Sequence, residues 1–169
     1  IRRSAGLGKP PKNFRSKSTH QHHNTDVVII GAGLSGLAAA KKFINTKYKV
    51  LLIEQDSYLG GVLKNSNKVK TINGLTPQEW ISETEELILN SKNITILKNT
   101  LVTTYNFTNH LIALEDKFAG KKIDLNKSEL TLHKIRTSNT IIANGHIERF
   151  ISFRNNDLPG VMLASSFEK

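Results

Sequence analysis

The sequence predicts an α/β fold, in which a parallel sheet built around a helix carries an inserted three-stranded antiparallel β-meander. Two observations lead to this prediction. Two short apolar runs flank a glycine-rich segment that becomes helical, and further along the chain apolar and polar residues alternate over three stretches before another apolar run. The first pattern is typical of buried parallel strands joined by a helix, and the second of a sheet with one solvated face.

The strand–helix–strand unit is expected between residues 26 and 54. Asp26–Gly31 (DVVIIG) is apolar and β-branched, as in a strand buried on both faces, and it ends in glycine. A helix should follow from Leu34 to about Thr46, where apolar residues recur at helical spacing. Lys49–Glu54 (KVLLIE) is then a second buried strand. The crossover of such a unit is right-handed.

The best-marked helix begins after Thr76, a good N-cap, and runs to about Asn90. Pro77 occupies its first position, and Glu79 completes a capping box with Thr76. Its apolar face is expected to hold Trp80, Thr84, Leu87 and Ile88.

The remaining strands follow from two kinds of pattern. A short apolar run and a later one predict buried strands at Ile94–Leu97 and Asn139–Ala143. Alternation between them predicts the meander, with a polar, lysine-rich loop before its third strand. The three meander strands and that loop are Leu101–Phe107, His110–Leu114, Glu129–Thr137 and Glu115–Ser128.

Charge divides the chain of 169 residues into two parts. Residues 1–25 hold six basic side chains and no acidic one, whereas residues 26–169 hold 18 basic and 14 acidic side chains. We therefore interpret residues 1–25 as a basic, extended linker or arm and residues 26–169 as one domain, which we expect to be incomplete at its C-terminal end. Because the sequence begins at Ile1 and not at methionine, we expect a piece of a longer protein.

The net charge of +10 does not by itself predict a nucleic-acid partner. No aromatic-plus-basic repeat and no zinc-finger spacing accompanies it. The longest weakly polar stretch, Val27–Ala40, is shorter than the roughly 20 residues that cross a bilayer. We expect neither a nucleic-acid nor a membrane partner, and a cytoplasmic location.

Cysteine is absent, which excludes disulfides, thiolate metal centres, cysteine-held iron–sulfur clusters and a thiol nucleophile. No catalytic constellation and no metal site is predicted, so any chemistry would come from a cofactor or from parts of the protein outside this sequence. The histidines are interpreted as solvated arm residues or as surface and packing residues: His20, His22 and His23 in the first group, His110, His133 and His146 in the second.

The motif that carries chemistry is Gly31-Ala32-Gly33-Leu34-Ser35-Gly36, a G-x-G-x-x-G between the first strand and the helix. Glu54 ends the second strand 18 residues after Gly36. This context turns the pattern into a dinucleotide-binding fingerprint. Gly31 permits the tight turn, Gly33 lets backbone approach a pyrophosphate, and Gly36 lets the helix pack close to the strand. The sequence therefore predicts a Rossmann-like FAD/NAD(P)-binding domain.

Two further segments should complete this site. Glu54 can accept hydrogen bonds from ribose hydroxyls, and its charge would repel a 2′-phosphate, which favours NAD or FAD over NADP. The fingerprint does not decide between NAD and FAD. Ala143-Asn144-Gly145 should end the last buried strand beside the pyrophosphate, although an ordinary turn would explain Asn144-Gly145 equally well.

Three longer segments make the chain resemble the α subunit of heterotetrameric sarcosine oxidase. The segments are DVVIIGAGLSGLAAA, VLLIEQDSYLGG and IIANGHIERFISFRNNDLPGVMLASS, supported by the opening IRRSAGLGKPP and by TINGLTPQEW. The resemblance covers nearly the whole chain, and IRRSAGLG and NNDLPGVMLAS are its most specific parts. The α-type subunits of opine, hydroxyproline and cyanide-forming amine dehydrogenases are the second family it resembles.

The resemblance implies a function for the complex to which such a subunit belongs. That complex demethylates sarcosine oxidatively to glycine, forms hydrogen peroxide and passes the one-carbon unit to tetrahydrofolate. It implies partner subunits of β, γ and δ type, FAD in the β subunit, FMN between α and β, and a folate site in another part of the α subunit. This chain alone would then be inactive.

The resemblance also implies that the fingerprint holds NAD, with FAD as the alternative occupant. The cofactor-binding residues expected from the motif and the resemblance together are Gly31, Gly33, Leu34, Ser35, Gly36, Glu54, Gln55, Gly61, Asn144 and Gly145. The family's Ala-Thr-Gly reads Ala143-Asn144-Gly145 here, and the bulkier His146 replaces a small residue. A cofactor-free scaffold module is the remaining alternative.

Overall fold

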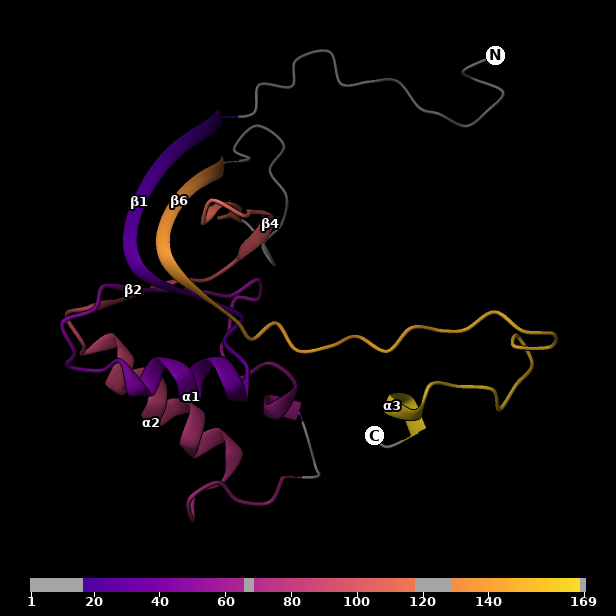
Figure 1. Cartoon of the computed structure of the whole chain (residues 1–169). Coiled ribbons are helices and arrows are strands. Elements are labelled where there is room, and N and C mark those ends of the chain that lie inside the picture. The colour runs from indigo at the N-terminus through magenta and orange to yellow at the C-terminus, as the bar shows by residue number, and fades with distance from the viewer. Residues whose placement is uncertain (1–16, 66–68, 118–128, 168–169) are drawn as a thin grey trace, which may run out of the picture.

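The computed structural model describes residues 17–65, 69–117 and 129–167. These residues form one six-stranded sheet with helices on one side (Figure 1). The strands and helices, in chain order, are β1 (Lys17–Ile30), α1 (Leu34–Lys42), β2 (Val50–Ile53), the 3₁₀ helix η1 (Gly61–Asn65), α2 (Pro77–Leu89), β3 (Ile94–Leu97), β4 (Thr100–Asn106), β5 (His110–Asp116), β6 (Glu129–Ile142) and α3 (Ala164–Phe167).

The strand order is β3-β2-β1-β6-β5-β4. β1, β2, β3 and β6 pair in parallel, whereas β5 pairs antiparallel with both β6 and β4. The predicted α/β class, with an antiparallel meander inserted before the last parallel strand, is therefore confirmed.

Both faces of the parallel strands are covered, but by different layers. On one face, Val27, Ile29 and Leu52 pack with Leu37 of α1 and Ile88 of α2 in the larger core cluster. On the other face, a smaller cluster joins the alternate strand residues to residues of the meander: Val28, Leu51, Ile53, Leu111, Ala113 and Ile135. Burial on both faces explains why β2 is apolar at every position.

The boundary expected after residue 25 is wrong for the described part of the arm. β1 already begins at Lys17, and residues 17–25 pair with residues 129–137 of β6. This half of β1 is polar, so it lacks the apolar alternation that marks a strand in sequence. Its pairing is supported instead by polar side-chain contacts such as that between the Thr19 and Thr131 hydroxyls, at 3.0 Å. Residues 1–16 lie outside the described residues.

The meander differs from the prediction at its last strand. The strands expected at 129–137 and 139–143 are one strand, β6, which bends together with β1 as it passes from the meander to the parallel sheet (Figure 1). The paired register omits Asp26 and Ser138 at this bend. Most of the expected loop at 115–128 lies outside the described residues.

Two helix predictions need smaller corrections. α1 ends at Lys42, four residues before the expected end, and Phe43 is its C-cap. In α2 the buried face holds Ile81 in place of Leu87, whose side chain is 38% exposed. No helix in the described ranges is long and apolar enough to cross a membrane.

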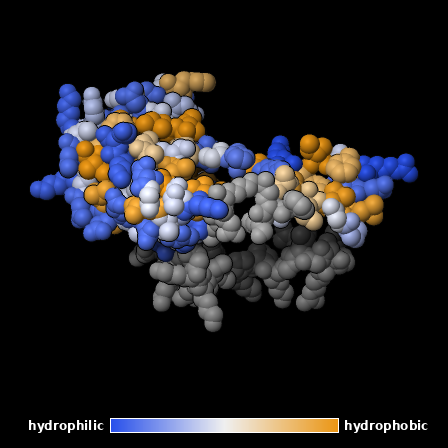
Figure 2. Space-filling view, turned by 90° about the horizontal axis from the view of Figure 1, so that it is seen from below, coloured by the Kyte–Doolittle hydropathy of each residue, from blue (hydrophilic) through white to orange (hydrophobic). Residues whose placement is uncertain are grey.

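The segment that follows β6 runs away from the sheet as an extended strap before α3 (Figure 1). Apolar side chains lie among charged ones along it (Figure 2). Ile147, Ile151 and Phe153 are all exposed. Within this chain, therefore, the strap contributes little to the core.

The capping box of α2 gives a stability prediction. The Glu79 N–H donates to the Thr76 hydroxyl, and the Glu79 carboxylate accepts from the Thr76 N–H at 2.8 Å. The bonds that this carboxylate accepts, from the Thr76 N–H and from the Thr76 hydroxyl, hold the pKa of Glu79 below its ordinary value. We expect Thr76→Ala to lower the free energy of unfolding by about 1 kcal/mol in urea denaturation near neutral pH. The difference should shrink as the pH falls through the lowered pKa of Glu79, because protonation removes the acceptor charge.

Ser82→Ala is the matched control, because Ser82 is an exposed residue in the middle of the same helix. It should leave the stability unchanged or slightly raised, since alanine has the higher helix propensity. Equal losses for the two variants would contradict the capping role.

Candidate dinucleotide-binding site

The fingerprint glycines form the turn from β1 to α1 at the carboxyl ends of the parallel strands. Gly31 has φ +96°, and a Cβ there would lie 2.5 Å from the Ala143 carbonyl oxygen. A Cβ on Gly36 would overlap the Gly31 carbonyl. These two positions accept only glycine because helix, turn and the end of β6 approach each other so closely.

Gly33 differs from its two neighbours in the motif. It is the N-cap of α1 with an ordinary extended backbone, and a Cβ there would meet nothing within 4 Å. Packing therefore does not explain why this residue is glycine. We call the open space above Gly33 the cradle.

The N-terminus of α1 lies beside this cradle, and its first N–H groups have no partner within the helix. The first intrahelical bond runs from the Leu37 N–H to the Gly33 carbonyl, so the N–H groups of Leu34, Ser35 and Gly36 precede it. No side chain caps them, and the first turn holds no acidic residue. These donors and the positive end of the helix dipole favour an anion such as a pyrophosphate.

Glu54 lies directly after β2 and is only 6% exposed. One carboxylate oxygen accepts from the Ala32 N–H at 2.6 Å, and the other accepts from the Asp56 N–H at 3.0 Å. The carboxylate therefore fastens the end of β2 to the middle of the glycine turn, which sequence reasoning did not foresee. Each oxygen can accept a second hydrogen bond, so acceptor capacity for ribose hydroxyls remains.

A second glycine pair closes one side of the cradle. The Gly60 N–H donates to the Ala32 carbonyl at 2.8 Å, and a Cβ on Gly61 would lie 3.3 Å from the Gly33 Cα. A Cβ on Gly60 would instead meet Ile81 of α2. Gly61, which the resemblance implies as a cofactor-binding residue, lies beside Gly33. Gly60 was not among the expected site residues, and it packs against α2.

The residues that follow β6 lie against the first glycine of the turn, Gly31. Asn144 is exposed, and a Cβ on Gly31 would lie 3.0 Å from its Cα. The structure thus brings the expected residues from the glycine turn, from Glu54, from Gly61 and from Asn144-Gly145 to one edge of the sheet. Gln55 follows Glu54 with its side chain exposed, and no contact ties it to the others.

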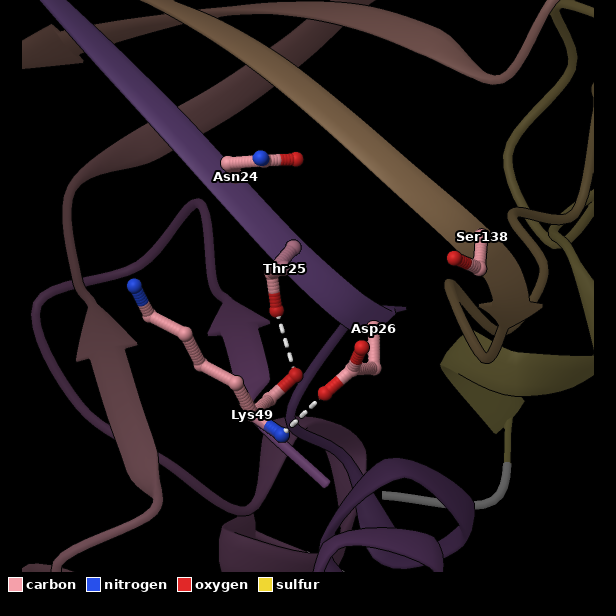
Figure 3. Close-up of a pocket in the computed structure, with 5 residues that line it drawn as sticks. All are labelled: Asn24, Thr25, Asp26, Lys49 and Ser138. Carbon is pink, nitrogen blue, oxygen red and sulfur yellow. Dashed lines mark hydrogen bonds between the residues drawn. The ribbon is translucent and has the colours of Figure 1, made fainter. Parts of the chain in front are cut away.

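A polar hollow lies at the opposite end of the parallel strands, at the bend in β1 and β6 (Figure 3). There the Thr25 hydroxyl donates to the Lys49 carbonyl, and the Lys49 N–H donates to Asp26 at 2.7 Å. The other lining residues are Asn24 and Ser138. This hollow is remote from the glycine turn and holds none of the residues expected to bind a cofactor.

One histidine interpretation is wrong: His23 is not a solvated arm residue but lies half-buried on β1, with its ring 2.8 Å from that of His133. His133 is 1% exposed, as expected of a packing histidine, and its two ring nitrogens lie within hydrogen-bonding distance of His23 and Glu115. These contacts could not be predicted because the three residues are far apart in the chain. In the described part of the chain no group of three or more histidine, aspartate or glutamate side chains is arranged to hold a metal ion.

Comparisons with known proteins agree with this geometry. Residues 29–76 match the NAD(P)-binding Rossmann-like domain family. Sarcosine oxidase subunit alpha from Corynebacterium sp. (strain U-96) is 31% identical over 96% of this chain, and that from Rhizobium meliloti (strain 1021) is 30% identical over 98%. The chain spans 17% of the length of these relatives. The resemblance to a segment of the sarcosine oxidase α subunit is confirmed.

Solved structures show the same fold. L-proline dehydrogenase from P. horikoshii aligns over 86% of this chain and 27% of its own, with a TM-score of 0.56 and 22% identity. Thioredoxin reductase from T. acidophilum aligns over 80% of this chain and 40% of its own, with a TM-score of 0.55 and 16% identity. Together, the comparisons support a dinucleotide-binding domain of the oxidoreductase type, without distinguishing FAD from NAD.

Substitution by alanine should have very different effects on stability at Gly36 and at Gly33. Gly36→Ala should lower the free energy of unfolding by about 3 kcal/mol or more, because its Cβ overlaps the Gly31 carbonyl. Gly33→Ala should change it by only about 0.5 kcal/mol, since its Cβ enters open space. Urea denaturation of both variants measures the difference, and equal losses would show that the turn is packed differently.

Proposed function

We propose that this chain binds an adenine dinucleotide, NAD with FAD as the alternative occupant, as the dinucleotide-binding portion of a multisubunit amine oxidoreductase of the sarcosine oxidase type. The observation that carries the proposal is the open cradle at Gly33. Packing requires glycine at Gly31 and Gly36 but leaves Gly33 unexplained, and a bound pyrophosphate supplies the missing reason.

Each side of the cradle has a part in holding the ligand. The N–H groups of Leu34 and Ser35 donate to the pyrophosphate, and Gly61 allows it to approach the second loop. Asn144 and Gly145 border the site from the end of β6. When bound, NAD would supply hydride-transfer chemistry, and FAD would supply electron transfer.

Glu54 has two tasks in this proposal. Its bonds to the Ala32 and Asp56 N–H groups hold the turn, and its remaining lone pairs accept from the adenosine ribose. Its negative charge disfavours a phosphate on the 2′-hydroxyl, so NAD should bind more tightly than NADP.

We further propose that the reaction belongs to the whole complex. By similarity to its relatives, this complex oxidises sarcosine to glycine with formation of hydrogen peroxide and methylene-tetrahydrofolate. Partner subunits of β, γ and δ type would complete it, with FMN and FAD elsewhere in the complex and folate bound outside this segment. A cytoplasmic location is part of the same proposal, as is the inactivity of this chain alone.

Isothermal titration calorimetry of the full chain tests the proposal, with far-UV circular dichroism to show that each sample is folded. We expect one NAD or FAD per chain, weaker binding of NADP, and at least a tenfold loss of affinity in Gly33→Ala, whose Cβ enters the space of the pyrophosphate. Ala38→Ser is the matched control, an equally small change at an exposed position of α1, and it should bind as the parent does.

Folded protein that binds neither NAD nor FAD would overturn the proposal and favour a cofactor-free scaffold. Equal affinity for NAD and NADP would retain dinucleotide binding but refute the role given to Glu54. Turnover of an opine or hydroxyproline, and not of sarcosine, by the complex would favour the related dehydrogenases.

A further inference from the structure

Two asparagines in the sequence are followed directly by glycine, Asn73 and Asn144. Such a pair is chemically labile, because glycine has no side chain to shield its backbone nitrogen from the asparagine amide. That nitrogen can attack the side-chain carbonyl carbon, which closes a five-membered succinimide ring and releases the side-chain nitrogen, with the glycine N–H proton, as ammonia. Water then opens the ring at one of its two carbonyl groups and yields aspartate or isoaspartate. Water is the only co-reactant, so the local conformation decides the rate.

The first pair, Asn73-Gly74, forms the tip of a tight hairpin turn. Ile72 and Leu75 exchange two backbone hydrogen bonds, at 2.8 and 3.0 Å, and φ is positive at both central residues, 52° at Asn73 and 86° at Gly74. Positive φ at both positions is typical of a type I′ turn. Because ring closure requires the backbone between Asn73 and Gly74 to rotate, the turn must open first. Its two hydrogen bonds therefore protect Asn73.

The second pair, Asn144-Gly145, lies just beyond the end of β6, where the chain leaves the sheet (Figure 1). The last bond to the sheet is the one that the Ala143 N–H donates to the Ile30 carbonyl, at 2.8 Å. Asn144 and Gly145 are exposed, and neither forms a hydrogen bond within the described part of the chain. A Cβ on Gly145 would meet nothing within 4 Å. The Asn144 amide thus has room to approach the Gly145 nitrogen, and no hydrogen bond has to break first.

The position of Asn144 gives its conversion a consequence for the candidate site. A Cβ on Gly31 would lie 3.0 Å from the Asn144 Cα, so Asn144 adjoins the first glycine of the turn. Its side chain is uncharged, which suits a neighbour of a pyrophosphate. Deamidation puts a carboxylate there, and isoaspartate also lengthens the backbone by one carbon atom. The new charge repels a bound pyrophosphate at short range, where salt screens little of the repulsion.

We propose that Asn144 is a site of spontaneous deamidation selected by the structure, and that its conversion to aspartate or isoaspartate weakens dinucleotide binding at the glycine turn. The first half of this proposal holds whether or not a ligand binds, and the second half rests on the proposed function. The modification lowers the affinity for the dinucleotide gradually while the core of the domain stays intact.

Incubation of the full chain at mildly alkaline pH tests the first half, with peptide mass spectrometry to follow both sites. We expect Asn144 to convert at least tenfold faster than Asn73 in the folded chain, because only Asn73 is held in a hydrogen-bonded turn. In urea, where the fold is lost, the two sites should convert at similar rates. Equal rates in the folded chain, or faster conversion of Asn73, would overturn the proposal, as would a preference for Asn144 that persists in urea.

Asn144→Gln is the diagnostic variant, because glutamine would have to close a six-membered ring, which forms much more slowly. The product at this position should disappear, whereas conversion of Asn73 should stay as in the parent. Asn73→Gln is the matched control, since Asn73 is also exposed, and it should leave the conversion of Asn144 unchanged. Undiminished isoaspartate in Asn144→Gln would place the reaction elsewhere and refute the assignment.

Asn144→Asp tests the second half, by isothermal titration calorimetry with NAD and with FAD. We expect an affinity about threefold below that of the parent, from one negative charge added beside the glycine turn. Asn73→Asp adds the same charge outside the expected site residues and should bind as the parent does. Equal affinities of the two variants would overturn the second half. A parent chain that binds neither ligand would overturn it together with the proposed function, and the deamidation rates would still decide the first half.

Discussion

The arrangement depends on the close contact between the start of α1 and the end of β1. Gly36 places the helix backbone against the Gly31 carbonyl, where no side chain fits. Because α1 begins so near the strand, its free N–H groups lie at the carboxyl edge of the sheet. The Glu54 carboxylate, the Gly60 N–H and the end of β6 then attach to the same turn. The close packing of Gly36 on Gly31 thus allows residues from four parts of the chain to meet at one turn.

The layer opposite the helices explains the shape of the sheet. The meander covers the second face of the parallel strands, so β1 and β6 each belong to two layers and bend where they pass from one to the other. Residues 27–30 of β1 are apolar and lie in or against the two core clusters. The other half of β1 is polar and relies on backbone pairing and on hydrogen bonds such as those of His23 and Thr19.

Much of this fold could be predicted from the sequence because its signals are local. The apolar strands, the glycine turn and the capping box at Thr76 each lie within a few residues. The strand at residues 17–25 could not be predicted, since its partner in β6 is more than 100 residues away and its side chains are polar. For the same reason the contacts of His133 with His23 and Glu115 could not be predicted. At the site, the motif predicted which residues meet, but not that Glu54 would bond inward to Ala32.

The proposed dinucleotide site lies on the glycine turn. Backbone-amide NMR of the full chain during titration with NAD, and in parallel with FAD, tests it most directly. We expect the largest shifts at Leu34, Ser35 and Gly61 and at residues 143–145. Shifts confined to the hollow around Asp26 and Lys49, or spread evenly over the sheet, would contradict it.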